Sequence, residues 1–421
     1  MGGLLLVAVV TVLYSLAASR LDRLSVGAPI VFVGAGVLLA PWLFGDSGAT
    51  FDTEPVRLLA EATLALLLFA DASGLGLGAV SRDAGLSGRL LGIGLPLTML
   101  LGTAIAYVLL PGTPWILAGL VAVILAPTDA ALSQPVLGNP LVPVRIRRTL
   151  NVESGLNDGI ATPVVTALIA LAVADEMQKV DGPVVAAEAI LVAVVVAVVV
   201  GGGGGRLIRR AHERGWSTPL SENLAVIVLA GASYVGAVQF GGNGFVAAFV
   251  AGLIFGRATR REMRAAIDYT ETTALFLSFA VWLVFGATLA RVLVTSPWNW
   301  SAIGYAALSL TVIRMVPVAL ALLGSGMRTT TVLFIGWFGP RGMASVVFLI
   351  VANDDLHVIG LTTPVIQAVG WTILLSVVLH GLTAGPLAQA YGARIAAVDP
   401  PPVEAEEADE PHPRRRSLLG D

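Results

Sequence analysis

Long apolar runs alternate with short polar connections along almost the whole chain of 421 residues. Several runs reach the ~20 residues that an α-helix needs to cross a bilayer. The runs are continuous and lack the polar/apolar alternation of transmembrane β-strands. Helices are also the default in lipid, because each helix satisfies its own backbone hydrogen bonds. The pattern therefore predicts an all-α polytopic membrane protein.

Glycine, proline and charged residues divide the chain into about thirteen apolar segments. We expect transmembrane helices at 2–18, 26–45, 56–72, 89–110, 114–135, 148–174, 184–205, 222–240, 244–257, 271–291, 300–323, 330–352 and 360–388. The first run resembles a secretion signal, but no basic region precedes it, so we interpret it as a transmembrane helix. Residues 395–421 are rich in proline and acidic residues and predict a disordered cytoplasmic tail.

The composition agrees with a membrane protein. Hydrophobic residues make up 56% of the chain and charged residues 13%, about half the charged fraction of a soluble domain. The chain has no cysteine, which excludes disulfides, thiol catalysis and thiolate metal sites.

Arginine is distributed unevenly between the two sets of loops. If thirteen helices alternate in direction, one set of loops contains Arg20, Arg23, Arg82, Arg89, Arg145, Arg147, Arg148, Arg206, Arg209, Arg210, Arg214, Arg257, Arg260, Arg261, Arg264 and Arg328. The other set contains only Arg57, Lys179 and Arg291. Positive residues mark the cytoplasmic side, so we expect the N-terminus outside and the C-terminus in the cytoplasm.

A few charged residues fall inside the apolar segments. They are Glu61, Asp71, Asp129, Glu153, Asp158, Glu271, Arg314 and Arg341. Each ionised group in a bilayer costs at least about 2.5–3.5 kcal/mol and usually faces a water-filled cavity or a charged partner. Glu61, Asp71 and Glu271 lie near segment ends, where an interfacial carboxylate is an equally good interpretation. The other five favour a functional site, whereas His380 is expected to pack in its apolar run.

The fifth and sixth segments bring oxygen-bearing side chains together. In "NVESGLNDG", helical spacing places Ser154 with Asp158 on one face, and Glu153 with Asn157 on another. In "LAPTDAAL", Pro127 disturbs the helix just before Thr128 and Asp129. Oxygens from Thr128, Ser154 and Asp158 suit a small alkali cation, whereas zinc or copper would need imidazole or thiolate ligands.

The twelfth segment carries a second break. In "FIGWFGPRGMASVV", Gly339, Pro340 and Gly342 interrupt the helix. Interrupted segments at matching positions in two halves are typical of inverted-repeat transporters. Segments 1–6 and 8–13 would be the repeats, with the seventh helix between them. The seventh helix ends in the glycine run 201–205, which favours close helix packing or a flexible helix end.

Two arginines accompany these breaks. Arg341 lies in the second break, where its charge would compensate nearby carboxylates and offset the half-helix ends. Arg314, within "LTVIRMVPVAL", needs a carboxylate partner, and Glu153 is the best candidate. A purely structural ion-pair role for both arginines stays open.

"APTD", "ESGLNDG", the Arg-Met-Val-Pro-Val stretch and "GPRG" together resemble the monovalent cation:proton antiporter-1 family, which includes NhaP-type sodium/proton antiporters and the sodium/hydrogen exchangers. The resemblance covers about residues 1–390. It implies a homodimer with dimerisation helices at 1–72 and 222–291, core transport helices at 89–174 and 300–388, and a linker helix at 184–205.

The resemblance also implies roles for the site residues. Asp158 would take either the proton or the cation, with Thr128 and Ser154 as cation ligands. Asp129 would help at the crossing of the broken helices, and Glu153 would pair with Arg314. The sequence Asn157-Asp158 would go with electroneutral exchange.

These observations predict antiport of Na⁺, or Li⁺, against H⁺ in a prokaryotic plasma membrane. The partners would be the cation, the proton, lipid and a second copy of the chain, with no nucleic acid and no cofactor. K⁺/H⁺ antiport, a cation channel and a sodium-coupled symporter remain alternatives. A hydrolase is not favoured, because the four histidines form no catalytic or metal-binding pattern.

Overall fold

The computed structural model describes residues 2–44, 54–75, 84–176, 182–260, 262–356, 361–398 and 403–405. Over these ranges the protein is helical throughout, with no strand. The all-α prediction is confirmed.

Each predicted apolar segment falls on one helix or on an interrupted helix. The elements are α1 (Gly2–Arg23), α2 (Ala28–Phe44), α3 (Glu54–Gly74), α5 (Ala84–Arg89), η1 (Leu90–Gly94), α6 (Leu95–Leu109), α7 (Trp115–Ile124), α8 (Gln134–Leu137), α9 (Val144–Glu176), α10 (Gly182–Ala197), η2 (Val198–Gly204), α11 (Gly205–Glu213), α12 (Pro219–Gln239), α13 (Gly244–Ala258), α14 (Arg264–Thr295), α15 (Trp300–Leu310), α16 (Val312–Ala321), α17 (Thr329–Trp337), α18 (Met343–Asp355), α19 (Thr363–Ala396) and η3 (Val403–Ala405).

Seven helices among the described residues are long and apolar enough to cross a membrane. They are Gly85–Leu109, Val144–Ala174, Pro183–Glu213, Pro219–Gln239, Arg264–Thr295, Trp300–Ala321 and Thr363–Ala396. Shorter apolar helices include α7 and α13. The number of thirteen crossings stays a prediction.

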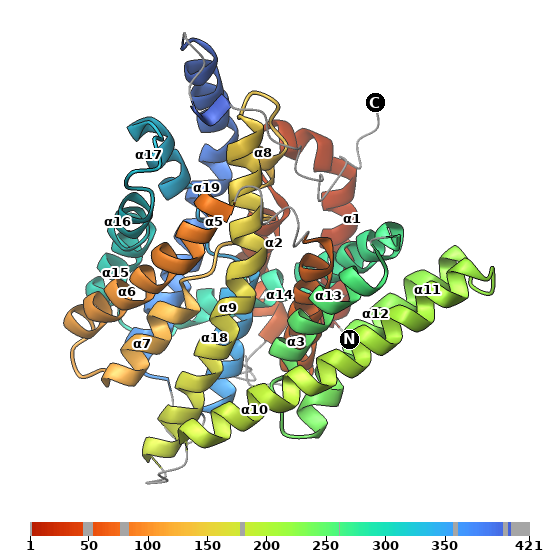
Figure 1. The fold of residues 1–421 in the computed structure, drawn as a ribbon. Coiled ribbons are helices and arrows are strands. Elements are labelled where there is room, and N and C mark those ends of the chain that lie inside the picture. The colour runs from red at the N-terminus through yellow and green to blue at the C-terminus, as the bar shows by residue number, and fades with distance from the viewer. Residues whose placement is uncertain are drawn as a thin grey trace.

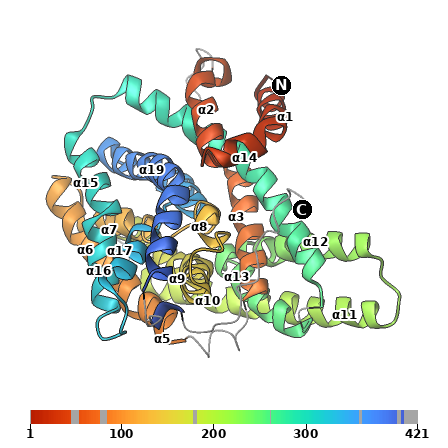
Figure 2. The ribbon, with the colours of Figure 1, turned by 90° about the horizontal axis from the view of Figure 1, so that it is seen from above.

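The helices form two groups. Helices α5–α9 and α15–α19 lie together on one side, and α1–α3 with α12–α14 lie on the other (Figures 1 and 2). Helix α10 contacts both α9 and α13 and continues through η2 and α11 as a long rod (Figure 1). The assignment of these groups as transport and dimerisation domains stays a prediction.

The two predicted breaks are present. Regular α-helix stops after α7 and resumes at α8, and it stops again after α17 and resumes at α18. Pro127 and Pro340 lie in the two gaps. Each contributes to its gap, because proline removes a backbone donor and clashes with the preceding turn. The gaps leave backbone groups exposed in the interior, and other parts of the chain must satisfy them.

Glycine allows helices to pack closely within the second group. A Cβ at Gly252 would meet the Phe69 carbonyl oxygen, and one at Gly256 would meet the Ser73 carbonyl oxygen, so α13 lies directly against α3. In the glycine run, a Cβ at Gly201 would meet backbone of Ala251. The close-packing interpretation of this run is confirmed.

The predicted tail needs a correction at its start. Helix α19 continues to Ala396, and η3 is ordered against the rest of the protein. Glu404 is 1% exposed, because its Oε1 accepts hydrogen bonds from Arg328 N (2.8 Å) and Thr331 Oγ1 (2.7 Å). Arg145 Nη1 donates to the Val403 carbonyl oxygen at 2.9 Å. Residues 399–402 and 406–421 of the predicted tail lie outside the described residues.

Candidate functional site

The two breaks meet in the interior of the first group of helices. The backbone N–H of Asp129, in the α7–α8 break, donates to the Pro340 carbonyl oxygen at 2.8 Å. Ser345 Oγ, in the first turn of α18, donates to the Ile124 carbonyl oxygen at the end of α7 at 2.7 Å. The exposed backbone of one break is thus satisfied in part by the other, which holds them together.

Asp129 links its own break to the start of α18. Its Oδ2 accepts from Met343 N at 2.9 Å, and its Oδ1 accepts from Ala131 N at 2.7 Å. A carboxylate is favourable at a helix N-terminus, where N–H groups lack intrahelical partners. Gly342 is required beside it, because a Cβ there would overlap the Asp129 carboxylate. These contacts place Asp129 at the crossing of the broken helices.

Arg341 is fully buried and reaches the opposite break. Its Nη1 donates to the carbonyl oxygens of Ala126 (2.9 Å) and Pro127 (3.3 Å). These carbonyls follow the C-terminal end of α7, where the helix dipole favours a cation. The expectation that Arg341 offsets a half-helix end agrees with this geometry.

Three polar side chains gather beside the first break. Thr128 Oγ1 lies 3.1 Å from Ser154 Oγ, and Asn157 Nδ2 donates to Thr128 Oγ1 at 2.6 Å. Their exposed fractions are 1% for Thr128, 5% for Ser154 and 1% for Asn157. Neutral oxygens from α9 and from the break therefore meet inside the protein.

Asp158 lies one turn after Ser154 on α9, on the same helix face. Its side chain is half-buried, unlike those of Ser154 and Asn157. Thr162 Oγ1 donates to the Asp158 backbone carbonyl oxygen at 2.6 Å. The face of α9 that presents Ser154 to the break thus also carries a carboxylate.

Glu153 and Arg314 form a buried ion pair. Arg314 Nη1 lies 2.6 Å from Glu153 Oε1, and the side chains are 2% and 3% exposed. Arg314 also packs against Gly339 in the second break, where a Cβ would overlap its guanidinium. The predicted pairing is present in the structure.

Glu61 has a local partner away from this site. Arg57 Nε lies 2.8 Å from Glu61 Oε1, and Arg57 also pairs with Asp354 and, at 3.0 Å, with Asp355. This cluster connects α3 with the C-terminal end of α18. The structural interpretation of Glu61 is thus favoured, whereas the roles of Asp71 and Glu271, both half-buried, stay open.

Two residues at the breaks were missed by the sequence reasoning. Ser345 joins the breaks as described above, and Ser376 Oγ accepts from Arg341 N at 2.6 Å. The available signal was weak, because serine within apolar segments commonly bonds only to its own helix. His380 is 1% exposed and packs against Trp337, with ring centroids 4.9 Å apart, as expected.

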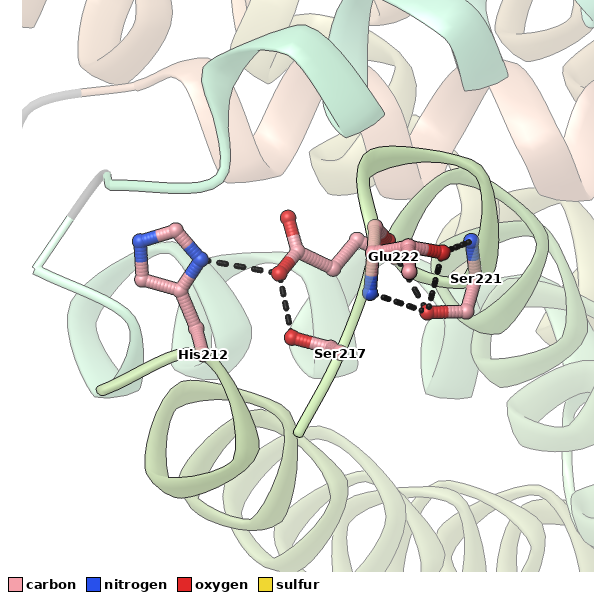
Figure 3. Close-up of polar contacts among 5 residues, drawn as sticks. His212, Ser217, Ser221 and Glu222 are labelled. Atoms are coloured by element: carbon pink, nitrogen blue, oxygen red, sulfur yellow. Dashed lines mark hydrogen bonds and ion pairs between the residues drawn. The ribbon is translucent and has the colours of Figure 1, made fainter. Parts of the chain in front are cut away.

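A second polar cluster lies at the turn between α11 and α12 (Figure 3). His212 Nδ1 lies 2.8 Å from Glu222 Oε1, which also accepts from Ser217 Oγ at 2.5 Å. Thr218 and Ser221 form a capping box at the start of α12. Among the described residues, the hydrogen bonds of this cluster run between residues 212 and 222, so it is separate from the candidate site.

Across the described ranges, no group of three or more His, Cys, Asp or Glu residues could hold a metal ion. The oxygens near Thr128 are mostly neutral, which suits a weakly held alkali cation more than a resident divalent metal.

Two interrupted helices that cross at their breaks, with buried charges beside them, define the architecture of a secondary transporter. The transmembrane sodium/hydrogen exchanger family matches residues 6–390, and the chain belongs to that family.

Known proteins extend this likeness. An Escherichia coli (strain K12) protein, the uncharacterized Na⁺/H⁺ exchanger YjcE, is 28% identical over 289 residues, covering 66% of this chain and 51% of YjcE. The chain thus spans about half the length of this curated relative.

Two structures of the sodium proton antiporter MjNhaP1 from Methanocaldococcus jannaschii are also similar. One, at pH 8, has a TM-score of 0.72 and 21% identity and covers 93% of this chain and 98% of MjNhaP1. The other has a TM-score of 0.64 and 20% identity and covers 91% and 96%. At this identity, the MjNhaP1 structures support the fold alone.

Proposed function

We propose that the chain exchanges a monovalent cation, Na⁺ or Li⁺, for H⁺ across the membrane. The observation that carries this proposal is the meeting of α9 with the first break. Ser154 contacts Thr128 there, and Asp158 follows on the same face of α9. One ionisable carboxylate beside hard neutral oxygens can bind either a proton or an alkali cation.

The ligand set would consist of Asp158, Thr128 and Ser154. Alkali cations prefer oxygen ligands, and partial dehydration by hydroxyl oxygens suits weak, reversible binding. Asn157 supports this set, because its side-chain amide donates to Thr128 Oγ1 and so holds the Thr128 hydroxyl in place. The site then needs no cofactor.

The other charges near the site hold the crossing together. Arg314 neutralises Glu153, and Asp129 accepts hydrogen bonds from two backbone N–H groups. Arg341 donates to backbone carbonyls of the first break. We assign stabilisation of the crossing to these four residues, and ion exchange to Asp158 because it shares the face of α9 that carries Ser154.

Competition at Asp158 would couple the two ions. An ionised carboxylate in a poorly hydrated site is costly, so occupancy by a proton or a cation favours movement of the site across the membrane. Because each occupant carries one positive charge, exchange through one carboxylate is electroneutral. The order Asn157-Asp158 is consistent with that stoichiometry.

The movement itself would follow the two groups of helices. Helices of 84–176 and 300–396 would move as the transport domain against a dimerisation domain formed by the first three helices and α12–α14. The partner would be a second copy of the chain. The proposed orientation has the N-terminus outside and the C-terminus in the cytoplasm of a prokaryotic plasma membrane, and the Arg-rich set of loops supports this orientation because positive residues favour the cytoplasmic side.

The test uses purified protein in liposomes with an acidic interior. Na⁺, Li⁺ or K⁺ is added outside, with a potassium/valinomycin clamp during the Na⁺ and Li⁺ runs. We expect cation-dependent alkalinisation of the lumen that persists under the clamp and is lost in Asp158→Asn. Alkalinisation by K⁺ alone would favour the K⁺/H⁺ alternative, and an unchanged rate in Asp158→Asn would overturn the proposal.

The pH dependence tests competition separately. Exchange should fall at low pH, where protons exclude the cation, and at high pH, where protons are scarce. A rate that rises continuously to pH 10 would contradict a shared carboxylate. Current carried by one cation without proton movement would favour a channel.

A further inference from the structure

Two side chains of α19 contact the second break from one side. Ser376 and His380 are four residues apart, so they share one face of the helix, and they are 0% and 1% exposed. Ser376 contacts the residue that follows Pro340, and His380 contacts the residue that ends α17. Ser376 therefore contacts the C-terminal end of the break, and His380 contacts its N-terminal end.

The contacts form a continuous chain. Arg341 N donates to Ser376 Oγ at 2.6 Å, and Ser376 Oγ lies 3.2 Å from His380 Nδ1. His380 Nε2 lies 2.8 Å from the Trp337 carbonyl oxygen. Trp337 O also accepts from Gly339 N at 2.8 Å, and a carbonyl oxygen has two lone pairs for these two donors.

In an unbroken α-helix, Arg341 N–H would donate directly to the Trp337 carbonyl, because the two residues are four apart. The break removes this hydrogen bond. Ser376 and His380 stand between the same donor and the same acceptor. We propose that the two side chains replace the missing helix hydrogen bond and that His380 is a positioning residue for the crossing.

The proton arrangement follows from the end points. A carbonyl oxygen only accepts, so His380 Nε2 donates to Trp337 O. In a neutral ring Nδ1 is then an acceptor for the Ser376 hydroxyl, whose oxygen accepts from Arg341 N.

A doubly protonated ring would donate from Nδ1 to the Ser376 carbonyl oxygen, 3.0 Å away. Arg341 and Arg314 already place two buried cations at this break, so a third positive charge is unfavourable. The neutral ring is the state that the surroundings support.

This replacement bond fixes the width of the break. Arg341 and Pro340 are held at one end, and from there the Arg341 guanidinium reaches Ala126 and Pro127 while the Pro340 carbonyl accepts from Asp129 N. Loss of the His380 contact would free the end of α17 and displace these groups by fractions of an ångström. The effect on transport rests on the proposed antiport, whereas the effect on the break does not.

Three single variants and one double variant of α19 test the inference. His380→Leu has similar bulk and no polar atom, and His380→Gln retains a terminal amide donor for Trp337 O. Thr372→Val is the matched control, because Thr372 is buried one turn before Ser376 and donates only within α19, to Ala368 O at 2.6 Å. All are compared at equal amounts of folded dimer or monomer after size-exclusion chromatography.

The first measurement is amide hydrogen exchange of residues 338–342, which does not depend on transport. We expect at least tenfold faster exchange at Arg341 in His380→Leu, partial recovery in His380→Gln and no change in Thr372→Val. Unchanged protection in His380→Leu would overturn the inference.

The second measurement is cation-dependent exchange in liposomes. We expect the maximal transport rate of His380→Leu to be at least tenfold lower than that of the wild type. The double variant Ser376→Ala/His380→Leu should be no slower than His380→Leu alone, because loss of either side chain already interrupts the series of hydrogen bonds from Arg341 N to Trp337 O. A further loss of rate in the double variant, or equal losses of rate in His380→Gln and His380→Leu, would show simple packing effects and overturn the positioning role. If His380→Leu shows the predicted faster amide exchange but the wild type shows no cation-dependent proton transport, the proposed function fails and the replacement bond stands.

Discussion

The Arg314 guanidinium lies 2.6 Å from the Glu153 carboxylate in a region where both side chains are almost completely buried. The pair joins α16 to α9, and Arg314 also packs against the second break through Gly339. Three parts of the candidate transport domain therefore depend on one ion pair. The pair contributes mainly by fixing the relative positions of these parts and adds little net stability, because the desolvation cost of burying two charges offsets much of their attraction.

Removal of one partner should be more damaging than removal of both. Arg314→Met leaves Glu153 as an uncompensated buried charge, and a loss of about 3–5 kcal/mol is typical of such a change. Arg314→Met combined with Glu153→Gln removes both charges and should recover part of that loss. Thermal unfolding in detergent checks this, with the control Arg210→Met on exposed α11. Equal unfolding temperatures for the single and double variants would contradict a coupled pair.

Stability and transport should both decrease when the charge of Asp129 is removed. In Asp129→Asn one carboxylate oxygen is replaced by an NH2 group, so the side chain can accept from only one of Met343 N and Ala131 N. We expect a loss of about 1 kcal/mol in unfolding free energy, typical of a weakened N-cap. We also expect a lower rate of cation/proton antiport in liposomes.

The unfolding midpoint and the liposome rate of Asp129→Asn are measured beside Asp268→Asn. Asp268 is an exposed carboxylate on α14, remote from the breaks. A variant of Asp129 that behaves like that of Asp268 would show that the carboxylate does not hold α18.

The α11–α12 turn should respond to pH through His212 (Figure 3). A hydrogen bond to Glu222 and the charge of Glu222 raise the pKa of His212 above its ordinary value near 6.5. The imidazolium is thus favoured in the folded protein. Its contribution to stability is fully present below the unfolded pKa and is lost as pH rises through the raised folded pKa.

His212→Gln measures this contribution. The difference in unfolding temperature between wild type and variant should be largest below pH 6 and should diminish toward pH 9. Ser221→Ala removes the hydrogen bond from Thr218 N to Ser221 Oγ, a capping contact of the same turn that does not titrate, and should shift stability equally at both pH values. A His212→Gln difference independent of pH would exclude the ion pair as its source.

Docking of η3 should depend on Glu404. Its Oε1 accepts from Arg328 N and Thr331 Oγ1, and hydrogen bonds to a charged group contribute about 1.5–3 kcal/mol when buried. Glu404→Ala should release the segment after α19, whereas Glu404→Gln retains an acceptor oxygen and should release it less. Limited proteolysis after Ala396 checks this, with at least tenfold faster cleavage expected in Glu404→Ala. Equal cleavage rates in the three proteins would show that Glu404 does not anchor the segment.

Much of the fold followed from the chain alone. Continuous apolar runs of bilayer length admit only helices in lipid, and Pro127 and Pro340, with the glycines beside Pro340, indicated the two breaks. The Glu153–Arg314 pair was also predictable, because a buried arginine needs a carboxylate and few were available. Local chemistry and composition were sufficient for these conclusions.

The tertiary structure decided how the breaks are satisfied. Nothing in the spacing of Asp129 shows that its carboxylate accepts from Met343, more than 200 residues later. The positions of Ser376 and His380 between Arg341 N–H and Trp337 O are equally invisible in an apolar segment. The physical reason is that a broken helix leaves backbone donors and acceptors whose partners are selected by three-dimensional packing. The sequence by itself determined that the helices break, and the fold determined which residues complete them.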